Sequence, residues 1–132
     1  MDKISSSIKI EDLEKFKLPY TKEQLRSMLL FYDFIGYYEN DALVGILIFK
    51  AVLDQANLIY IKVLEEFQKQ GIASYLMQQY HRILGHTFTF FLEVHQDNQA
   101  AIRLYKKMGY RRNRIRKNYY PDGDGWEMVY YE

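Results

Sequence analysis

The first regular spacing of apolar residues along this chain is that of a helix. Thr21 and Gln24 fit a capping box, in which each side chain bonds the backbone N–H of the other residue. Apolar residues then recur at the spacing of one helix face: Leu25, Met28, Leu29 and Tyr32. We therefore expect a helix over residues 21–32.

Extended patterns follow this helix. Residues 42–52 are apolar on both faces, which is typical of a covered, central strand. Strands are also expected over residues 34–38 and 58–64, because the segments between them, 39–41 and 53–57, carry turn residues. Short turns of this kind indicate three antiparallel neighbours.

The second half of the chain adds two more helices. Residues 72–84 have helical periodicity and stop at Gly85. Asn98 is a plausible N-cap for a further helix, whose apolar face ends at Gly109. Strands are expected over residues 87–94, 110–117 and 126–131, with a turn at 121–125.

This order of elements predicts the fold class. A helix between the strands at 58–64 and 87–94 makes that pair parallel, whereas the other neighbours are joined by short turns. We expect an α/β (α+β) fold: one mixed, mostly antiparallel sheet of about six to seven strands with helices on both faces. The length of 132 residues suits a single domain over residues 1–132.

Composition narrows the class of protein. The chain is 48% apolar, has a net charge of +1 and has no cysteine, which excludes disulfides and a cysteine nucleophile. Its longest apolar run, 42–49, falls far short of the roughly 20 residues that a membrane helix needs. The N-terminus shows no apolar segment of a secretion signal. We expect a cytoplasmic protein with no membrane partner.

Gly71 lies in the connection between a strand and a helix, a place where proteins bind anions. It precedes the helix at 72–84, and a helix N-terminus presents free N–H groups that bind anions such as phosphate. Gly71 and Ala73 leave room for a ligand to approach the backbone. Alternatively, these small residues only allow the helix to pack tightly on the sheet.

Several motifs carry a resemblance to a known family. Gln68-x-x-Gly71-x-Ala73 at the start of a helix resembles the acyl-CoA pyrophosphate motif of the GNAT-type N-acetyltransferases. Residues 91–94 and 98–110 are similar to the second half of that family's core. Residues 18–21 and 115–123, which include Asn118-Tyr119-Tyr120-Pro121, resemble the bacterial ribosomal-protein alanine N-acetyltransferases.

The resemblance implies acetyl-CoA as co-substrate, with no metal. It assigns acetyl-CoA contacts to the glycine turn, the strand before it and the next helix: Ile61, Lys62, Val63, Gln68, Lys69, Gln70, Gly71, Ile72, Ala73, Asn98 and Tyr105. The aromatic side chains of Tyr20, Tyr119 and Tyr120 would wall the acceptor groove. Tyr20 stands where that branch usually has tryptophan, and residues 125–128 lack its acidic pair, so the acceptor is less well determined than the reaction.

The same resemblance assigns two catalytic roles. Glu93 would take the proton of the attacking amine, directly or through a water, and burial beside Phe91 would raise its pKa. Its alternative is a strand-end glutamate that is exposed or paired with an arginine. Tyr105 would protonate the thiolate of coenzyme A; by periodicity alone it is a core tyrosine. Direct attack in a ternary complex suits a chain without cysteine.

Other features leave the function open. His81, His86 and His95 show no spacing of metal ligands. The basic residues 111–117 suit either a solvated edge strand or contacts with RNA, although we expect no nucleic-acid partner. The acceptor is expected to be a protein N-terminus, with alanine first, as in a small ribosomal protein. The alternatives are a lysine or small-molecule amine, or a non-catalytic module that binds acyl-CoA or RNA.

Overall fold

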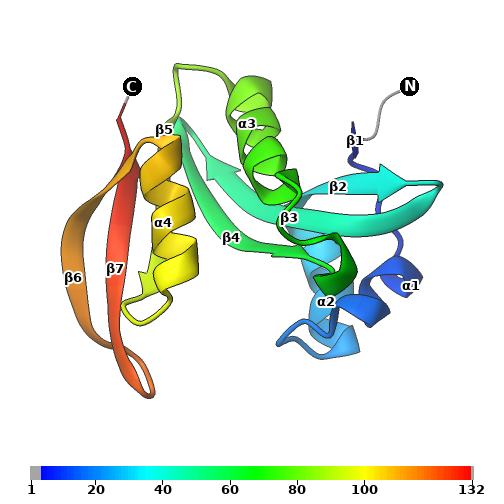
Figure 1. The fold of residues 1–132 in the computed structure, drawn as a ribbon, viewed down its shortest axis with the longest axis horizontal. Helices are drawn as coiled ribbons and strands as arrows, with labels where there is room; N and C mark the ends of the chain where they lie inside the picture. The colour runs from blue at the N-terminus through cyan, green and yellow to red at the C-terminus, as the bar shows by residue number, and fades with distance from the viewer. Residues whose placement is uncertain (1–3, 132) are drawn as a thin grey trace.

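A seven-stranded sheet runs through the computed structural model, which describes residues 4–131 (Figure 1). The strands are β1 (Ile4–Ser5), β2 (Asp33–Glu39), β3 (Ala42–Val52), β4 (Gln55–Val63), β5 (Thr89–His95), β6 (Tyr110–Tyr120) and β7 (Gly123–Tyr130). They lie in the order β1-β2-β3-β4-β5-β7-β6. Only β4 and β5 pair in parallel among these described strands, so the expected mixed, mostly antiparallel sheet is confirmed.

Helices cover both faces of this sheet. The helices are α1 (Ile10–Leu13), α2 (Lys22–Phe31), α3 (Ile72–Leu84) and α4 (Gln99–Met108), with short 3-10 turns η1 (Glu14–Phe16) and η2 (Glu65–Phe67). One core packs α3 and α4 on the sheet through Leu76, Tyr80 and Ile102, and these helices lie in front of it in Figure 1. A second core packs the N-terminal helices through Phe16 and Met28. None of the helices within residues 4–131 is long and apolar enough to cross a membrane.

The expected helix caps are present. The Thr21 N–H donates to Gln24 Oε1 at 2.8 Å, and the Gln24 N–H donates to Thr21 Oγ1 at 3.0 Å, which completes the capping box. Asn98 Oδ1 accepts from the Ala101 N–H at 3.2 Å at the start of α4. Gly85 and Gly109 terminate α3 and α4. These local signals placed the ends of α2, α3 and α4 to within one residue.

Two turns are shorter than expected. The segment 53–57 was expected to be a turn, but β4 already begins at Gln55, which pairs with Val52. Leu53 adopts a left-handed conformation (φ 56°), so two residues suffice to reverse the chain. The turn expected at 121–125 likewise shrinks to Pro121 and Asp122. The first 20 residues add β1, α1 and η1, for which no prediction was made.

A bulge in β4 opens the sheet. Leu58 pairs with Phe49 and Tyr60 with Ile48, so Ile59 is one extra residue in β4. The parallel ladder with β5 ends at the pair Leu58–Leu92, directly before this bulge. A bulge bends its strand, and β4 beyond Leu58 is bonded to β3 alone among the described strands. Figure 1 shows β4 running away from the β5–β7–β6 part of the sheet.

Candidate active site

The divergence of β4 and β5 creates a cleft of about 1290 Å³. Fourteen of the residues assigned to the site from the sequence line it: Tyr20, Ile61, Lys62, Val63, Gln68, Lys69, Gly71, Ile72, Ala73, Glu93, Asn98, Tyr105, Tyr119 and Tyr120. Gln70 does not line the cleft. The structure therefore brings residues from six separate segments of the chain to one place, as the resemblance implied.

The turn before α3 exposes backbone N–H groups to the cleft. Gly71 caps α3 with a left-handed conformation (φ 83°), and a Cβ built on it would meet no atom within 4 Å. Packing therefore does not require glycine at position 71, although Ala73 does pack against the core. The tight approach of α3 to the sheet occurs instead at Gly45, where a Cβ would lie 3.1 Å from Ile72 Cγ2. Gln68 fixes the turn by donating its side-chain N–H to the Val63 carbonyl at 2.9 Å.

These N–H groups form a cradle that suits an anion. The first residues of a helix have no carbonyl partner within the helix, and their N–H groups carry the positive end of the dipole. Ile72, Ala73 and Ser74 occupy this first turn and all line the cleft. Because Gly71 leaves the approach open, the diphosphate of a coenzyme A molecule fits the chemistry of this turn.

Glu93 lies on β5, one residue beyond Leu92, where the pairing of β5 with β4 ends. Its Oε1 accepts from Arg116 Nη1 at 3.1 Å, whereas Oε2 is buried with no hydrogen-bond partner. Burial raises the pKa of Glu93, the charge of Arg116 opposes this, and the charge of Glu127 raises the pKa further. The carboxylate is thus paired with an arginine and still has a raised pKa.

Tyr105 lies on α4 and also lines the cleft. Its side chain is only 6% exposed and belongs to the core, as its periodicity predicted. Burial, with smaller contributions from Tyr120 and Tyr60, raises its pKa to about 12. The phenol is therefore protonated near neutral pH and is available as a proton donor.

Three of the tyrosines assigned from the sequence line the cleft. Tyr20 packs edge-on against Tyr60, with ring centroids 6.1 Å apart. Tyr119 and Tyr120 form a second edge-on pair at 4.9 Å. They lie over Gly125, where a Cβ would come within 3.1 Å of both rings. The lining of the cleft thus includes aromatic side chains from separate segments of the chain.

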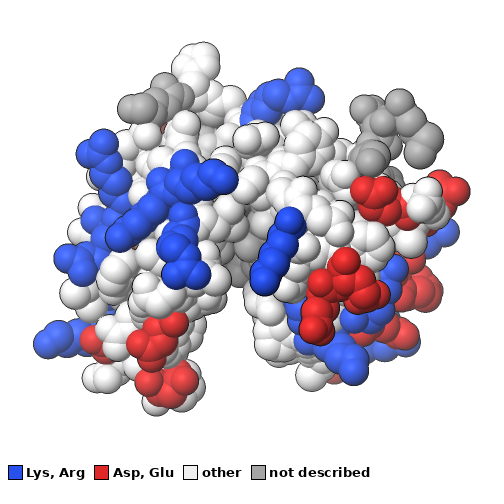
Figure 2. Space-filling view, viewed as in Figure 1, with Lys and Arg blue, Asp and Glu red and all other residues white. Residues whose placement is uncertain are grey.

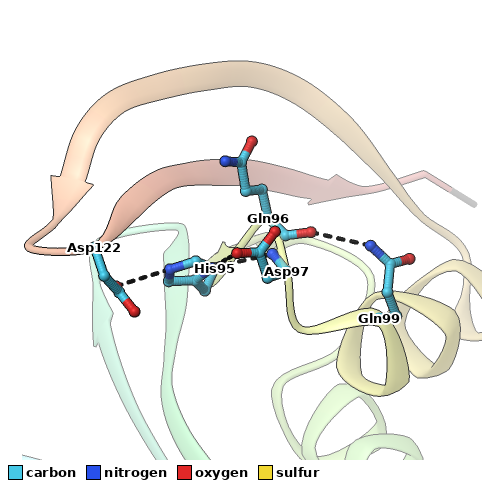
Figure 3. A network of polar contacts seen from close by, with 5 residues as sticks. All are labelled: His95, Gln96, Asp97, Gln99 and Asp122. Carbon is cyan, nitrogen blue, oxygen red and sulfur yellow. Dashed lines mark hydrogen bonds and ion pairs between the residues drawn. The ribbon is translucent and has the colours of Figure 1, made fainter.

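A polar network ties the β6–β7 turn to the end of β5 (Figure 3). His95 Nδ1 accepts from the Asp97 N–H at 3.0 Å, so its proton lies on Nε2 and is donated to Asp122 Oδ1 at 2.9 Å. Both ring nitrogens are therefore engaged, which leaves His95 a structural role beside Glu93. No local pattern in the sequence indicates this contact, because His95 and Asp122 are far apart in the chain.

The basic residues 111–117 lie on β6, an edge strand of the sheet. Figure 2 shows lysine and arginine side chains gathered over α4 and β6. Several are held by neighbours: Arg114 pairs with Glu127 at 3.2 Å, and Arg112 lies over the ring of Trp126 at 5.0 Å. Arg116 is the arginine that pairs with Glu93, a contact for which the sequence suggested an arginine without identifying which one. Within residues 4–131, no three acidic or histidine side chains are grouped as metal ligands.

Comparison with known proteins decides the family. Residues 6–110 match the family described as Acetyltransferase (GNAT) family. The chain belongs to this GNAT family. The resemblance inferred from Gln68, Gly71 and Ala73 is thereby confirmed.

Curated GNAT relatives share a specific description. The "[Ribosomal protein bS18]-alanine N-acetyltransferase" of Escherichia coli strain K12 is 37% identical over 91 residues, which are 67% of this chain and 62% of that protein. The protein of the same description from Haemophilus ducreyi is 38% identical over 93 residues, 69% of this chain and 64% of that protein. The chain thus spans less than two thirds of the length of these relatives.

Solved GNAT structures agree with the fold. The crystal structure of the ribosomal-protein-S18-alanine N-acetyltransferase from Escherichia coli has a TM-score of 0.86 at 28% identity, covering 96% of this chain and 91% of that one. A GNAT family acetyltransferase from Elizabethkingia anophelis, with acetyl-CoA bound, has a TM-score of 0.79 at 18% identity over the full length of both chains. The second likeness concerns the fold alone.

Proposed function

We propose that this protein is an N-acetyltransferase that transfers an acetyl group from acetyl-CoA to the N-terminal amine of a protein. One observation carries the proposal: a single cleft joins an open helix N-terminus, at Gly71, to the partly unpaired carboxylate of Glu93. The first can hold a diphosphate, and the second can accept a proton. A non-catalytic binding module would need the first feature but not the second.

Different residues of the cleft would bind different parts of acetyl-CoA. Residues 68–73 would bind the diphosphate through backbone N–H groups, and Ile61, Lys62 and Val63 line the edge of β4 released by the bulge. N–H groups along this edge could bond the pantetheine arm and the thioester oxygen. Asn98 would also contact the pantetheine arm, through the side-chain hydrogen-bonding groups that its capping bond to Ala101 does not use. Acetyl-CoA supplies the acetyl group and leaves as the free thiol.

Glu93 and Tyr105 would move the two protons of the reaction. The amine nitrogen forms a bond to the acetyl carbon, the carbon–sulfur bond breaks, and Glu93 takes the proton of the amine, directly or through a water. Tyr105 gives its proton to the leaving sulfur. Both pKa values support these roles, because that of Glu93 is raised toward useful basicity and Tyr105 stays protonated.

The acceptor that we favour is an N-terminal alanine of a small ribosomal protein. The curated relatives carry that activity in their description, and Tyr20, Tyr119 and Tyr120 offer an aromatic groove for an extended peptide. Because ribosomal proteins are made in the cytoplasm, the proposed reaction would take place there.

Mass spectrometry of peptides tests the proposal. Purified protein and acetyl-CoA would be incubated with an N-terminal alanine peptide followed by arginines, with its N-blocked twin containing an internal lysine, and with a set of small amines. Modification of the free alanine terminus alone is the expected result. Acetylation of only the lysine or a small amine would replace the acceptor, and binding of acetyl-CoA without transfer to any amine would contradict the enzymatic function.

A further inference from the structure

Arg116 links the candidate base to the candidate acceptor wall. It lies on β6, and its Nη1 donates to Glu93 Oε1 at 3.1 Å across the width of β7. The same guanidinium lies over the ring of Tyr119, 4.7 Å from the ring centroid. Arg116 does not itself line the cleft, so it can act there only through these two side chains.

The neighbouring carboxylate of Glu127 differs from that of Glu93 in its hydrogen bonds. Glu127 stands directly opposite Glu93 in the pairing of β5 with β7. Its Oε1 accepts from Asn113 at 2.8 Å, and its Oε2 accepts from Arg114. Both oxygens of Glu127 are therefore used, whereas Glu93 shares only Oε1 and keeps Oε2 without a partner.

Glu93 and Glu127 lie side by side on the sheet but differ in how many of their oxygens are hydrogen-bonded. Two like charges in direct register repel each other, so each carboxylate needs its own cation. Arg114 serves Glu127 and Arg116 serves Glu93. The single contact from Arg116 fixes the orientation of Glu93 and leaves its other oxygen, which is buried, without a hydrogen bond.

We propose that Arg116 is the positioning residue of this active site: it holds Glu93 by Oε1 and so orients the carboxylate that receives the proton of the amine, and it supports Tyr119 as part of the acceptor wall. This inference rests on the proposed function. Arg116 couples the base to the acceptor groove, since displacement of its guanidinium would disturb both at once.

The charges around Glu93 allow a test by pH. Arg116 and Arg114 on β6 lower its pKa, Glu127 on β7 raises it, and Tyr120 is the remaining titratable neighbour whose pKa responds to Glu93. Burial and the charge of Glu127 raise the pKa of Glu93, and Arg116 is the main group that opposes them. When the charge of Arg116 is removed, the pKa of Glu93 should rise, and the acid limb of kcat/KM should move to higher pH.

The experiment compares Arg116→Gln and Arg116→Lys with Arg112→Gln, which removes the same charge from the same strand without touching Glu93. Arg116→Gln should lower kcat/KM by roughly 10-fold or more and shift the acid limb upward. Arg116→Lys should keep the limb near its wild-type position, because the charge remains, but should lower the plateau. Arg112→Gln should match wild type in both.

A double variant shows whether Arg116 acts through Glu93. In a Glu93→Gln background, Arg116→Gln should add little further loss of kcat, because the group that it positions is already disabled. An unshifted acid limb together with fully additive losses would overturn the inference and leave Arg116 as a hairpin contact.

A readout independent of transfer separates this inference from the proposed function. The pKa of the Glu93 carboxyl can be followed by side-chain ¹³C NMR in wild type and in Arg116→Gln. An unchanged pKa overturns the role of Arg116 whatever the activity. A wild-type protein inert toward every amine overturns the proposed function instead, even where the carboxyl pKa shifts as expected.

Discussion

Replacement of Glu93 by glutamine isolates proton acceptance from the other properties of the side chain. The amide keeps the size of the carboxylate, and its single oxygen can still accept from Arg116, which now bonds Oε1 at 3.1 Å. The NH₂ group then takes the place of Oε2, the oxygen without a partner. An NH₂ group has no lone pair to offer an amine proton, so the variant should bind both substrates and transfer slowly.

The size of this effect follows from what remains in the site. General base catalysis contributes about 10² to 10⁴ in rate. We expect the lower end of this range, because water can still receive the proton while the remaining contacts are intact. A loss of ~10²-fold in kcat corresponds to about 2.7 kcal/mol of transition-state stabilisation.

Steady-state rates with the alanine peptide and calorimetric binding of acetyl-CoA measure the two expectations. Glu127→Gln is the matched control, since it makes the same change directly across the sheet at a carboxylate whose oxygens are both used. It should keep most of the activity and move the acid limb to lower pH, because the charge of Glu127 raises the pKa of Glu93. Wild-type turnover in Glu93→Gln, or equal losses in the two variants, would refute the assignment.

The same variant should not lose stability at neutral pH. The pKa of Glu93 is raised in the folded state, so the native protein binds more protons than the unfolded chain between the ordinary and the raised value. Stability therefore falls as pH rises through that window, and ionised Glu93 is a cost above it. Thermal unfolding at pH 7 should show Glu93→Gln at least as stable as wild type, with any advantage gone at pH values below the ordinary pKa of glutamate.

The other predictions concern the thiol end, the glycine turn and a buried histidine. Tyr105→Phe should lower kcat by up to ~10²-fold with little change in KM for acetyl-CoA, because only the proton donor is lost; steady-state kinetics check this. Gly71→Ala and Gly85→Ala should each cost about 1–2 kcal/mol in urea unfolding, since both glycines have positive φ angles (83° and 87°) and open surroundings. Only Gly71→Ala should also weaken acetyl-CoA binding. Burial lowers the pKa of His81 from 6.5 to about 4, so stability should fall as pH drops through that range. His81→Gln should flatten this dependence in thermal unfolding measured across the window.

Local patterns in the sequence determined most of the secondary structure correctly. The capping box at Thr21 and the cap at Asn98 involve residues three positions apart, so the sequence contains both partners of each bond. The bounds of β3 were predicted to the residue because its apolar run ends at turn residues on both sides. The motif from Gln68 to Ala73 is similarly local, and it led to the family.

Contacts between distant strands could not be predicted in this way. The pairing of Arg116 with Glu93 depends on the register of β5, β7 and β6, which includes shifts near Arg112 and Arg116. The bond between His95 and Asp122 depends on the same registers. Gly45 was an unremarked residue of an apolar run, although the approach of α3 requires it. In each case the sequence supplied the residue and only the fold supplied its neighbour.

Ile59 has a consequence for how this fold tolerates insertions and deletions. Ile59 and Tyr60 both pack toward the N-terminal helices, whereas Leu58 and Ile61 pack toward α3 and α4. Loss of Ile59 would therefore restore strict alternation without moving any other side chain of β4 to the wrong face. The hydrophobic core would be preserved while β4 lost the bend that separates it from β5. We therefore expect deletion of Ile59 to bring β4 closer to β5 and to narrow the cleft, rather than to disrupt the core.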